Sequence, residues 1–83
     1  MIKINIKPFF KNTRLKIKDL KFLLNKNDNL IKVKKIIKDE FIKTISDNKI
    51  EIIINGFIIL NDNLSLKSLN LSDEETILFT IID

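Results

Sequence analysis

The sequence predicts a single α+β domain in which one helix covers one face of a mixed β-sheet. Residues 2–7 alternate apolar and polar side chains with the period of two that half-buried strands show. The segment 30–41 repeats its apolar residues every three or four positions, which is the spacing of a helix, and β-rich runs follow it. A chain of 83 residues has room for one hydrophobic core, so we expect one domain over 1–83.

The N-terminal part of the chain predicts a β-hairpin. Because proline has no N–H to donate to a ladder, Pro8 should mark the end of the first strand or an edge bulge. A second alternating run covers 15–24, and a slip in its phase indicates a β-bulge near Asp19. We expect the two runs to pair, with a loop near 11–13.

A polar break precedes the helical segment. Asp28 or Asn29 can accept a hydrogen bond there from the free first-turn amides and so cap the helix. Lysines fill the side opposite the apolar stripe, so we interpret the segment as an amphipathic helix with a solvated outer face. The stripe itself consists of Leu30, Val33, Ile37 and Phe41.

The second half of the chain predicts another hairpin and a final strand. β-Branched residues fill 50–54, and a second apolar run covers 57–60. Asn55-Gly56 joins them, and both residues tolerate the positive φ of a type I′ turn. After an interrupted leucine-rich segment, residues 76–82 end the chain as a strand. The predicted order is strand, strand, helix, strand, strand, turn, strand.

Strand alternation predicts an apolar patch on the sheet face away from the helix. Ile52 and Ile54 should face the helix, so Ile53 between them points outward. Leu78 and Ile82 point outward on the last strand for the same reason. Exposed apolar patches usually mark interaction sites, which favours a partner-binding surface here.

Two other interpretations of this patch stay open. Scattered exposed apolar residues are normal on protein surfaces and need no partner. The first loop can also fold Phe9 or Phe10 over the patch.

Composition disfavours several other functions. The chain has no His or Cys, so the commonest general base and the strongest nucleophile are missing, and we expect no enzyme. The acidic runs 39–40 and 73–75 fall at solvated boundaries, and Asp47 and Asp62 lack the spacing of a calcium loop, so we expect no metal and no other cofactor. The charge of +4 comes almost wholly from Lys, with Arg14 the one Arg, which disfavours nucleic-acid binding.

The N-terminus does not read as a targeting segment. No apolar run matches a signal peptide or a membrane span. We therefore expect a protein that works in the cytoplasm, the nucleus or both, without a membrane. We also expect a monomer.

These segments in series resemble the ubiquitin-like family over nearly the whole chain. Residues 28–39 are similar to the family's helix without a gap, and 74–79 match the entry to its last strand. The run 60–71 resembles the family's leucine, acidic turn, Ser/Thr-Leu, tyrosine-turn and isoleucine series, with Leu69 replacing the tyrosine. The resemblance implies a β-grasp fold, in which a mixed five-stranded sheet packs on one helix in the order ββαββ-turn-β and the first and last strands are adjacent and parallel.

The chain also departs from the family. Its first loop is several residues longer than that of ubiquitin, and Glu51 stands where the family has a basic residue. It ends at Asp83 without the C-terminal Gly-Gly that conjugating members use in adenylation and transfer. We therefore expect a non-conjugating member or domain, and the sulfur-carrier relatives are disfavoured on the same ground.

The resemblance also implies a binding surface. By position the family's recognition patch corresponds to Ile53, Leu78 and Thr80, with Gly56 and Phe57 at its border. This implies a non-catalytic domain that binds a ubiquitin-receptor-like or proteasomal protein, free-standing or as the N-terminal domain of a larger protein of the ubiquitin–proteasome pathway.

Two other functions compete with this one. The first is that of a free-standing, non-conjugated ubiquitin-like modifier in pre-mRNA splicing, where Asp28 would hold a partner helix. In that family paired aromatic residues stand at the positions of Thr80 and Ile81, and this chain lacks them. We therefore rank this alternative below the protein-interaction domain. A basic nucleic-acid-binding module ranks last.

Overall fold

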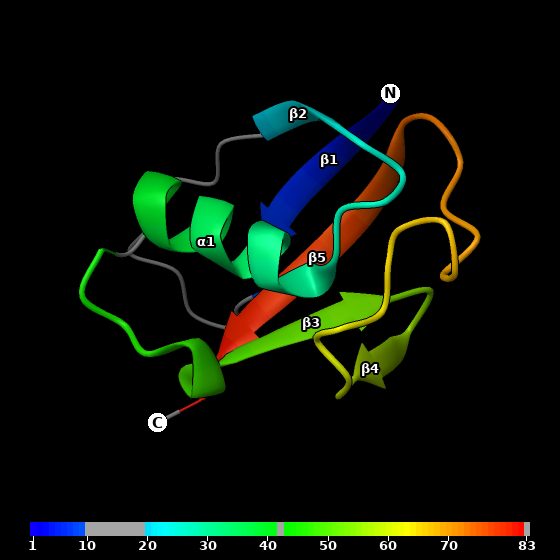
Figure 1. Cartoon of the computed structure of the whole chain (residues 1–83). Coiled ribbons are helices and arrows are strands. Elements are labelled where there is room, and N and C mark those ends of the chain that lie inside the picture. Colours follow the sequence, from blue (N-terminus) through cyan, green and yellow to red (C-terminus); the bar gives the residue numbers. More distant parts are fainter. Residues whose placement is uncertain (10–19, 42, 83) are drawn as a thin grey trace.

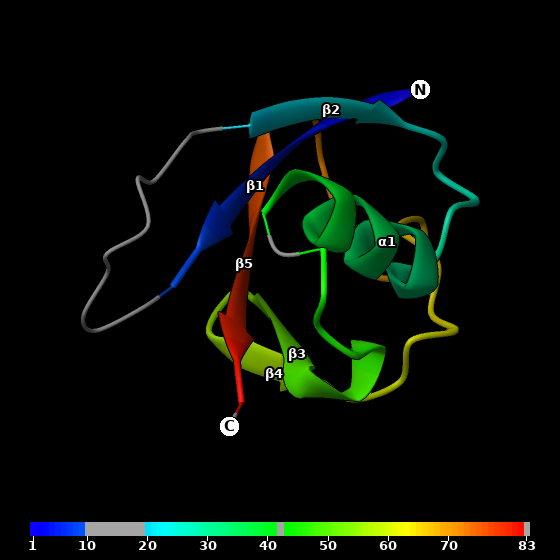
Figure 2. The same cartoon turned by 90° about the vertical axis from the view of Figure 1, so that its left-hand side faces the viewer.

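The computed structural model describes residues 1–9, 20–41 and 43–82, in which five strands form one sheet beside a single α-helix, α1. The strand order is β2-β1-β5-β3-β4, and α1 lies across one face (Figures 1 and 2). β5 is central and runs parallel to β1, while the other neighbours are antiparallel, as the resemblance implied. The elements are β1 (Ile2–Pro8), β2 (Leu20–Leu24), α1 (Leu30–Glu40), the 3₁₀ helix η1 (Asp47–Lys49), β3 (Ile50–Ile54), β4 (Phe57–Ile59) and β5 (Glu75–Ile81).

β1 and β2 form the expected antiparallel hairpin, with Ile4 opposite Phe22. The three isoleucines of β1 are buried, and its polar residues lie on the other face, as the alternation predicted. Pro8 is the last residue of β1, which is the first of its two predicted positions, the strand end. The predicted loop near 11–13 and the predicted bulge near Asp19 lie outside the described residues.

α1 begins after Asn29, whose extended backbone and side-chain oxygen form the N-cap. Asn29 Oδ1 accepts a hydrogen bond from the backbone N–H of Lys32 at 3.3 Å. At the other end Phe41 caps the helix, and its ring packs edge-on against that of Phe79 in β5, with 4.9 Å between centroids. The remaining residues of the predicted apolar stripe are fully buried, which confirms the amphipathic interpretation.

The hydrophobic core lies between α1 and the sheet and is almost wholly aliphatic. Burying each such side chain contributes roughly 1.5–3 kcal/mol, and the helix and all three central strands supply them. Among the described residues, Lys34 of α1 is the one charged side chain within this buried layer. The buried apolar residues are Ile2, Ile4, Ile6, Leu24, Leu30, Val33, Ile37, Ile50, Ile52, Ile54, Leu66, Leu71, Ile77 and Phe79.

The β3–β4 hairpin turns at Asn55 and Gly56, as the sequence predicted. Their φ angles of 52° and 82° are both positive, which a type I′ turn requires. A two-residue turn sets the register of the strands that it joins, and here it places Ile53 directly opposite Ile58. β4 ends at Ile59, one residue earlier than expected.

The leucine-rich segment between β4 and β5 forms a series of turns that close one end of the core. Leu66 and Leu71 are buried there. The segment is held against the approach to α1, because Leu66 N–H donates to Asp28 O and Lys67 N–H donates to Lys26 O, both at 2.9 Å. These bonds satisfy backbone groups that no strand pairing covers.

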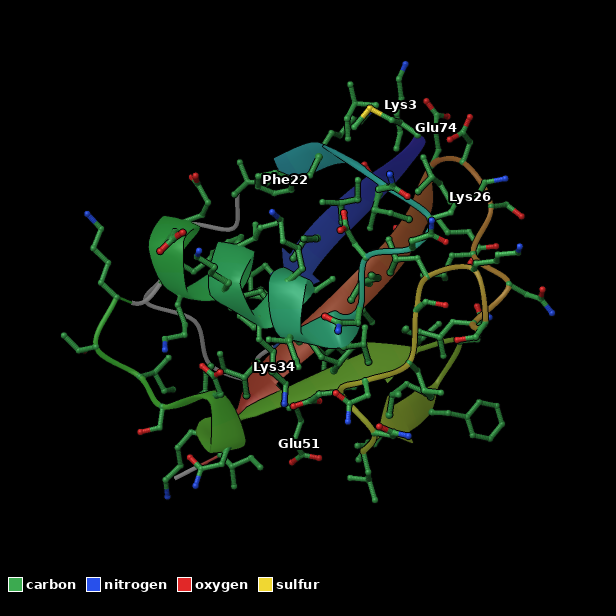
Figure 3. The ribbon with its side chains drawn as sticks, viewed as in Figure 1. Lys3, Phe22, Lys26, Lys34, Glu51 and Glu74 are labelled. Carbon is green, nitrogen blue, oxygen red and sulfur yellow. The ribbon has the colours of Figure 1, made fainter. Side chains whose placement is uncertain are left out.

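Glu74 lies just before β5. Its backbone has a left-handed φ of 67°, which residues with a Cβ rarely adopt. Its N–H donates to Lys3 O at 2.8 Å, and its carbonyl oxygen accepts from Asn5 Nδ2 at 2.9 Å. Asp73 Oδ1 accepts from Lys3 N–H at 2.9 Å beside it. Figure 3 shows Lys3 and Glu74 together at this end of the sheet. These bonds hold the strained residue in place and join the start of β5 to β1.

Relief of that strain is measurable. We predict that Glu74→Gly raises the free energy of unfolding by about 0.5–1 kcal/mol, because glycine adopts positive φ at no steric cost. Urea denaturation followed by circular dichroism measures the change. Glu75→Gly is the matched control, since it removes the same charge at the first residue of β5, where φ is not positive, and should lower stability by about 0.5–1 kcal/mol. A lower free energy of unfolding in Glu74→Gly would contradict the claim that the Glu74 backbone is strained.

Candidate protein-binding surface

The sheet face away from α1 carries an apolar row that crosses three strands. Ile58 of β4 is the register partner of Ile53 in β3, and Ile53 is in turn the partner of Leu78 in β5. Directly opposed residues project to the same side of a sheet. Ile52 and Ile54, on either side of Ile53, are buried toward α1, so the row faces away from the helix as the alternation predicted.

An open hollow of about 340 Å³ lies over this row. Its aromatic wall is Phe9, whose N–H donates to Phe79 O at 2.7 Å and so continues the β1–β5 pairing past the end of β1. Ile53 and Leu78 are half-buried at its floor, whereas Phe9 and Ile58 are 54% and 52% exposed. The hollow is lined by Phe9, Ile53, Gly56, Ile58 and Leu78.

Phe9 does not seal the patch, which was one of the alternatives to a binding surface. Its side chain is more than half exposed and leaves the hollow open beside it. Phe10, the other residue considered as a cover, lies outside the described residues.

Charges of both signs border the apolar row. Lys7 of β1 is the register partner of Leu78, so it continues the row across a fourth strand. Glu51 of β3 is the partner of Thr80 and lies one step along the same face. The apolar row therefore has a lysine on one side and a carboxylate on another.

Thr80 and Ile82 lie farther along this face. Thr80 is half-buried opposite Glu51, two residues beyond Leu78. Ile82 follows β5, where its N–H donates to Lys49 O at 2.8 Å, and its side chain is 40% exposed. The structure therefore brings Ile53, Gly56 and Leu78 together at the hollow, whereas Thr80 and Ile82 extend the surface away from it.

Phe57 was expected at the border of the patch, but Ile58 lies there instead. Phe57 is 72% exposed, but it pairs with Ile54, whose side chain faces α1, so Phe57 projects to the other side of the sheet. Ile58 takes the place at the hollow, and it was not among the residues selected from the sequence. The Asn-Gly turn contained the signal, because a two-residue turn pairs Ile53 with Ile58.

Asp28, the candidate of the splicing alternative, lies before α1 and away from the hollow. Its Oδ2 accepts a hydrogen bond from Asn25 N–H at 2.9 Å. Its carboxylate thus stabilises the turn that leads into the helix, which is a structural role.

A second hollow, of about 390 Å³, lies where β3 extends past the short β4. Lys34 of α1 points toward it and Glu51 lies on its other side (Figure 3). Lys34 Nζ contacts Asp62 Oδ2 at 2.8 Å, and the two side chains are 8% and 31% exposed. Asp62 Oδ1 is buried with no hydrogen-bond partner among the described residues. The paired charges neutralise each other and join α1 to the turn after β4.

In the part of the chain that the structure describes, no group of three or more His, Cys, Asp or Glu residues could hold a metal ion. Over those same residues, no helix has the length and apolar character needed to cross a bilayer.

Comparison with known proteins shows the fold. No family model and no curated protein matches the sequence. By contrast, 285 chains of known structure match, among them the ubiquitin of Caldiarchaeum subterraneum. That structure is 18% identical and superposes with a TM-score of 0.78, covering 99% of this chain and 94% of the archaeal one. At this identity the likeness shows the ubiquitin-like β-grasp fold alone, and it confirms the fold that the resemblance implied.

The ion pair of the second hollow is open to test. We predict that Lys34→Met lowers the free energy of unfolding by about 1–3 kcal/mol, because Asp62 loses its cation while only part of its carboxylate can rehydrate. Methionine keeps the apolar stem of the side chain, so urea denaturation reports mainly the lost charge.

Lys38→Met is the matched control on the same helix. Lys38 pairs with Asp47 at 2.9 Å, but the two side chains are 34% and 54% exposed, so solvent screens the pair and this change should alter stability by less than about 0.5 kcal/mol. Equal effects of the two substitutions would contradict a special role for the Lys34–Asp62 pair.

Proposed function

We propose that this chain is a ubiquitin-like protein-interaction domain that binds partner proteins through its hollowed sheet face and catalyses no reaction. The observation that carries the proposal is the row of Ile58, Ile53 and Leu78 beneath the open hollow beside Phe9. A contiguous apolar surface in water is unfavourable, and a partner that covers it gains the free energy of burying it.

The shape of the hollow favours one anchoring side chain from the partner. Its aliphatic floor and aromatic wall suit an apolar side chain, and energetic hot spots of interfaces are usually such filled pockets. Lys7 and Glu51 at the border would then set orientation through complementary charges. The partner that we propose is a ubiquitin-receptor-like or proteasomal protein. We propose that the domain binds it as a monomer, in the cytoplasm or the nucleus. The ubiquitin-like fold supports this class.

The anchor pocket gives the first test of this function. We predict that Ile53→Ala weakens binding to a ubiquitin-receptor domain of a proteasomal subunit by at least about tenfold, because truncating a central apolar anchor typically costs about 2 kcal/mol. Isothermal titration measures the affinity, and circular dichroism checks that the fold is kept.

Ile31→Ala is the matched control, because it makes the same chemical change at an exposed position on α1, away from the hollow. It should leave the affinity unchanged. Equal affinities of the wild type and Ile53→Ala would refute the proposed surface.

Salt dependence separates this function from nucleic-acid binding. We predict that affinity for the receptor domain changes little between low and physiological salt, because the contact is mainly apolar. A module that neutralises 6–10 phosphates would lose about 10³-fold or more between roughly 50 and 200 mM salt. Fluorescence anisotropy with a labelled oligonucleotide measures nucleic-acid affinity across the same salt range. Tight, steeply salt-dependent binding would favour the nucleic-acid alternative.

A further inference from the structure

The turn at the border of the hollow contains the one Asn-Gly pair of the chain. Gly56 is the only glycine, and every other asparagine precedes a residue with a side chain. This matters because a backbone nitrogen can attack the side-chain amide of the preceding asparagine. A side chain on the attacking residue hinders that approach, and glycine has none.

We propose that Asn55 is a site of spontaneous deamidation and that the product changes the border of the hollow. Gly56 N, on losing its proton, attacks Asn55 Cγ, and the bond from Cγ to the amide nitrogen breaks. Ammonia leaves with that proton, and a five-membered succinimide remains. Water then opens the ring at either carbonyl, which yields aspartate or an isoaspartyl link through the side chain. Water is the only co-reactant.

No neighbouring group crowds the two residues that react. Asn55 and Gly56 are both exposed, and a Cβ built on Gly56 would meet nothing within 4 Å. The β3–β4 pairing starts at Ile54 and Phe57, so the nitrogen of Gly56 stands outside the ladder. Within the described ranges, the Asn55 side chain has no hydrogen bond.

Some of the other described asparagines have side chains that hydrogen bonds restrain. Asn25 Oδ1 accepts from Asn27 N–H at 2.9 Å, and Asn61 Oδ1 accepts from Asn63 N–H at 3.0 Å. Asn5 Nδ2 donates to Glu74 O at 2.9 Å. These bonds restrain the amide that would have to turn toward the following nitrogen, so the same chain provides internal controls.

The type I′ turn must open before the ring can close, because its backbone holds Asn55 in the left-handed region. Such opening is inexpensive at this place. β4 has three residues, lies at the edge of the sheet and exposes Phe57 and Ile58, so few buried contacts resist local fraying. The reaction rate therefore reports the opening of this hairpin.

The product affects the hollow in two ways. Either product adds a carboxylate beside Gly56, which lines the hollow, and lowers the net charge of +4 by one. The isoaspartyl product also lengthens the main chain inside a two-residue turn, which disturbs the register that sets Ile58 opposite Ile53. The consequence for partner binding rests on the proposed function, whereas the chemistry does not.

The test ages the purified full chain at mildly alkaline pH and maps its peptides by mass spectrometry. We expect the mass gain of an amide-to-acid change at Asn55, with isoaspartate present, while Asn25 and Asn61 stay intact. Asn55→Gly is the control, because Gly-Gly keeps a type I′ turn and has no amide to lose. No gain at Asn55, or equal gains at the other asparagines, would overturn the site.

A second measurement addresses the hollow itself. Methyl NMR of the aged protein should show shifts concentrated at Ile53, Ile58 and Leu78, and unchanged methyl signals in a fully converted sample would overturn the effect on the border. Asn55→Asp keeps the turn and adds the carboxylate. It should lower the affinity for the receptor domain severalfold. If Ile53→Ala abolishes binding while Asn55→Asp leaves it unchanged, the carboxylate has no effect on the proposed function, which itself stands.

Discussion

In the part of the chain that the structure describes, one helix covers one face of a five-stranded sheet, and this is the constraint on which the rest of the structure depends. The aliphatic stripe of α1 buries one face, and a helix of 11 residues, about 16 Å long, can do no more. β5 pairs with β1 on one side and with β3 on the other and so joins the two hairpins, which makes one continuous sheet beneath that helix. The opposite face must then meet water or another molecule, and its apolar row is the candidate surface.

The turn between β3 and β4 links local chemistry to that surface. Asn55 and Gly56 tolerate positive φ, and the resulting two-residue turn sets the register that brings Ile58 beside Ile53. A slip of one residue would turn every side chain of β4 to the other face. Asn55-Gly56 suits the turn because glycine has no side chain. For the same reason, Asn55 is the asparagine that we propose to be most susceptible to deamidation.

Local periodicity predicted most of the fold but did not decide two features, the partner of Lys34 and the direction of Phe9. The stripe of α1, the outward direction of Ile53 and the Asn-Gly turn all follow from spacing along the chain. Lys34 is four residues after Leu30 and so lies on the buried side of the helix, but its partner Asp62 comes from a turn 28 residues away, which no local pattern reveals. Phe9 lies past the end of its strand, where alternation no longer indicates direction.

By itself the sequence determined where strands, helix and turns form, because these follow from backbone geometry and from the repeat of apolar residues. It also determined the charge and the absence of His and Cys, which narrow the possible chemistry. Only the tertiary structure decided that Phe9, Ile58 and Leu78 enclose one hollow. They come from three strand segments far apart in the chain, and their meeting depends on strand order and register, which long-range pairing sets.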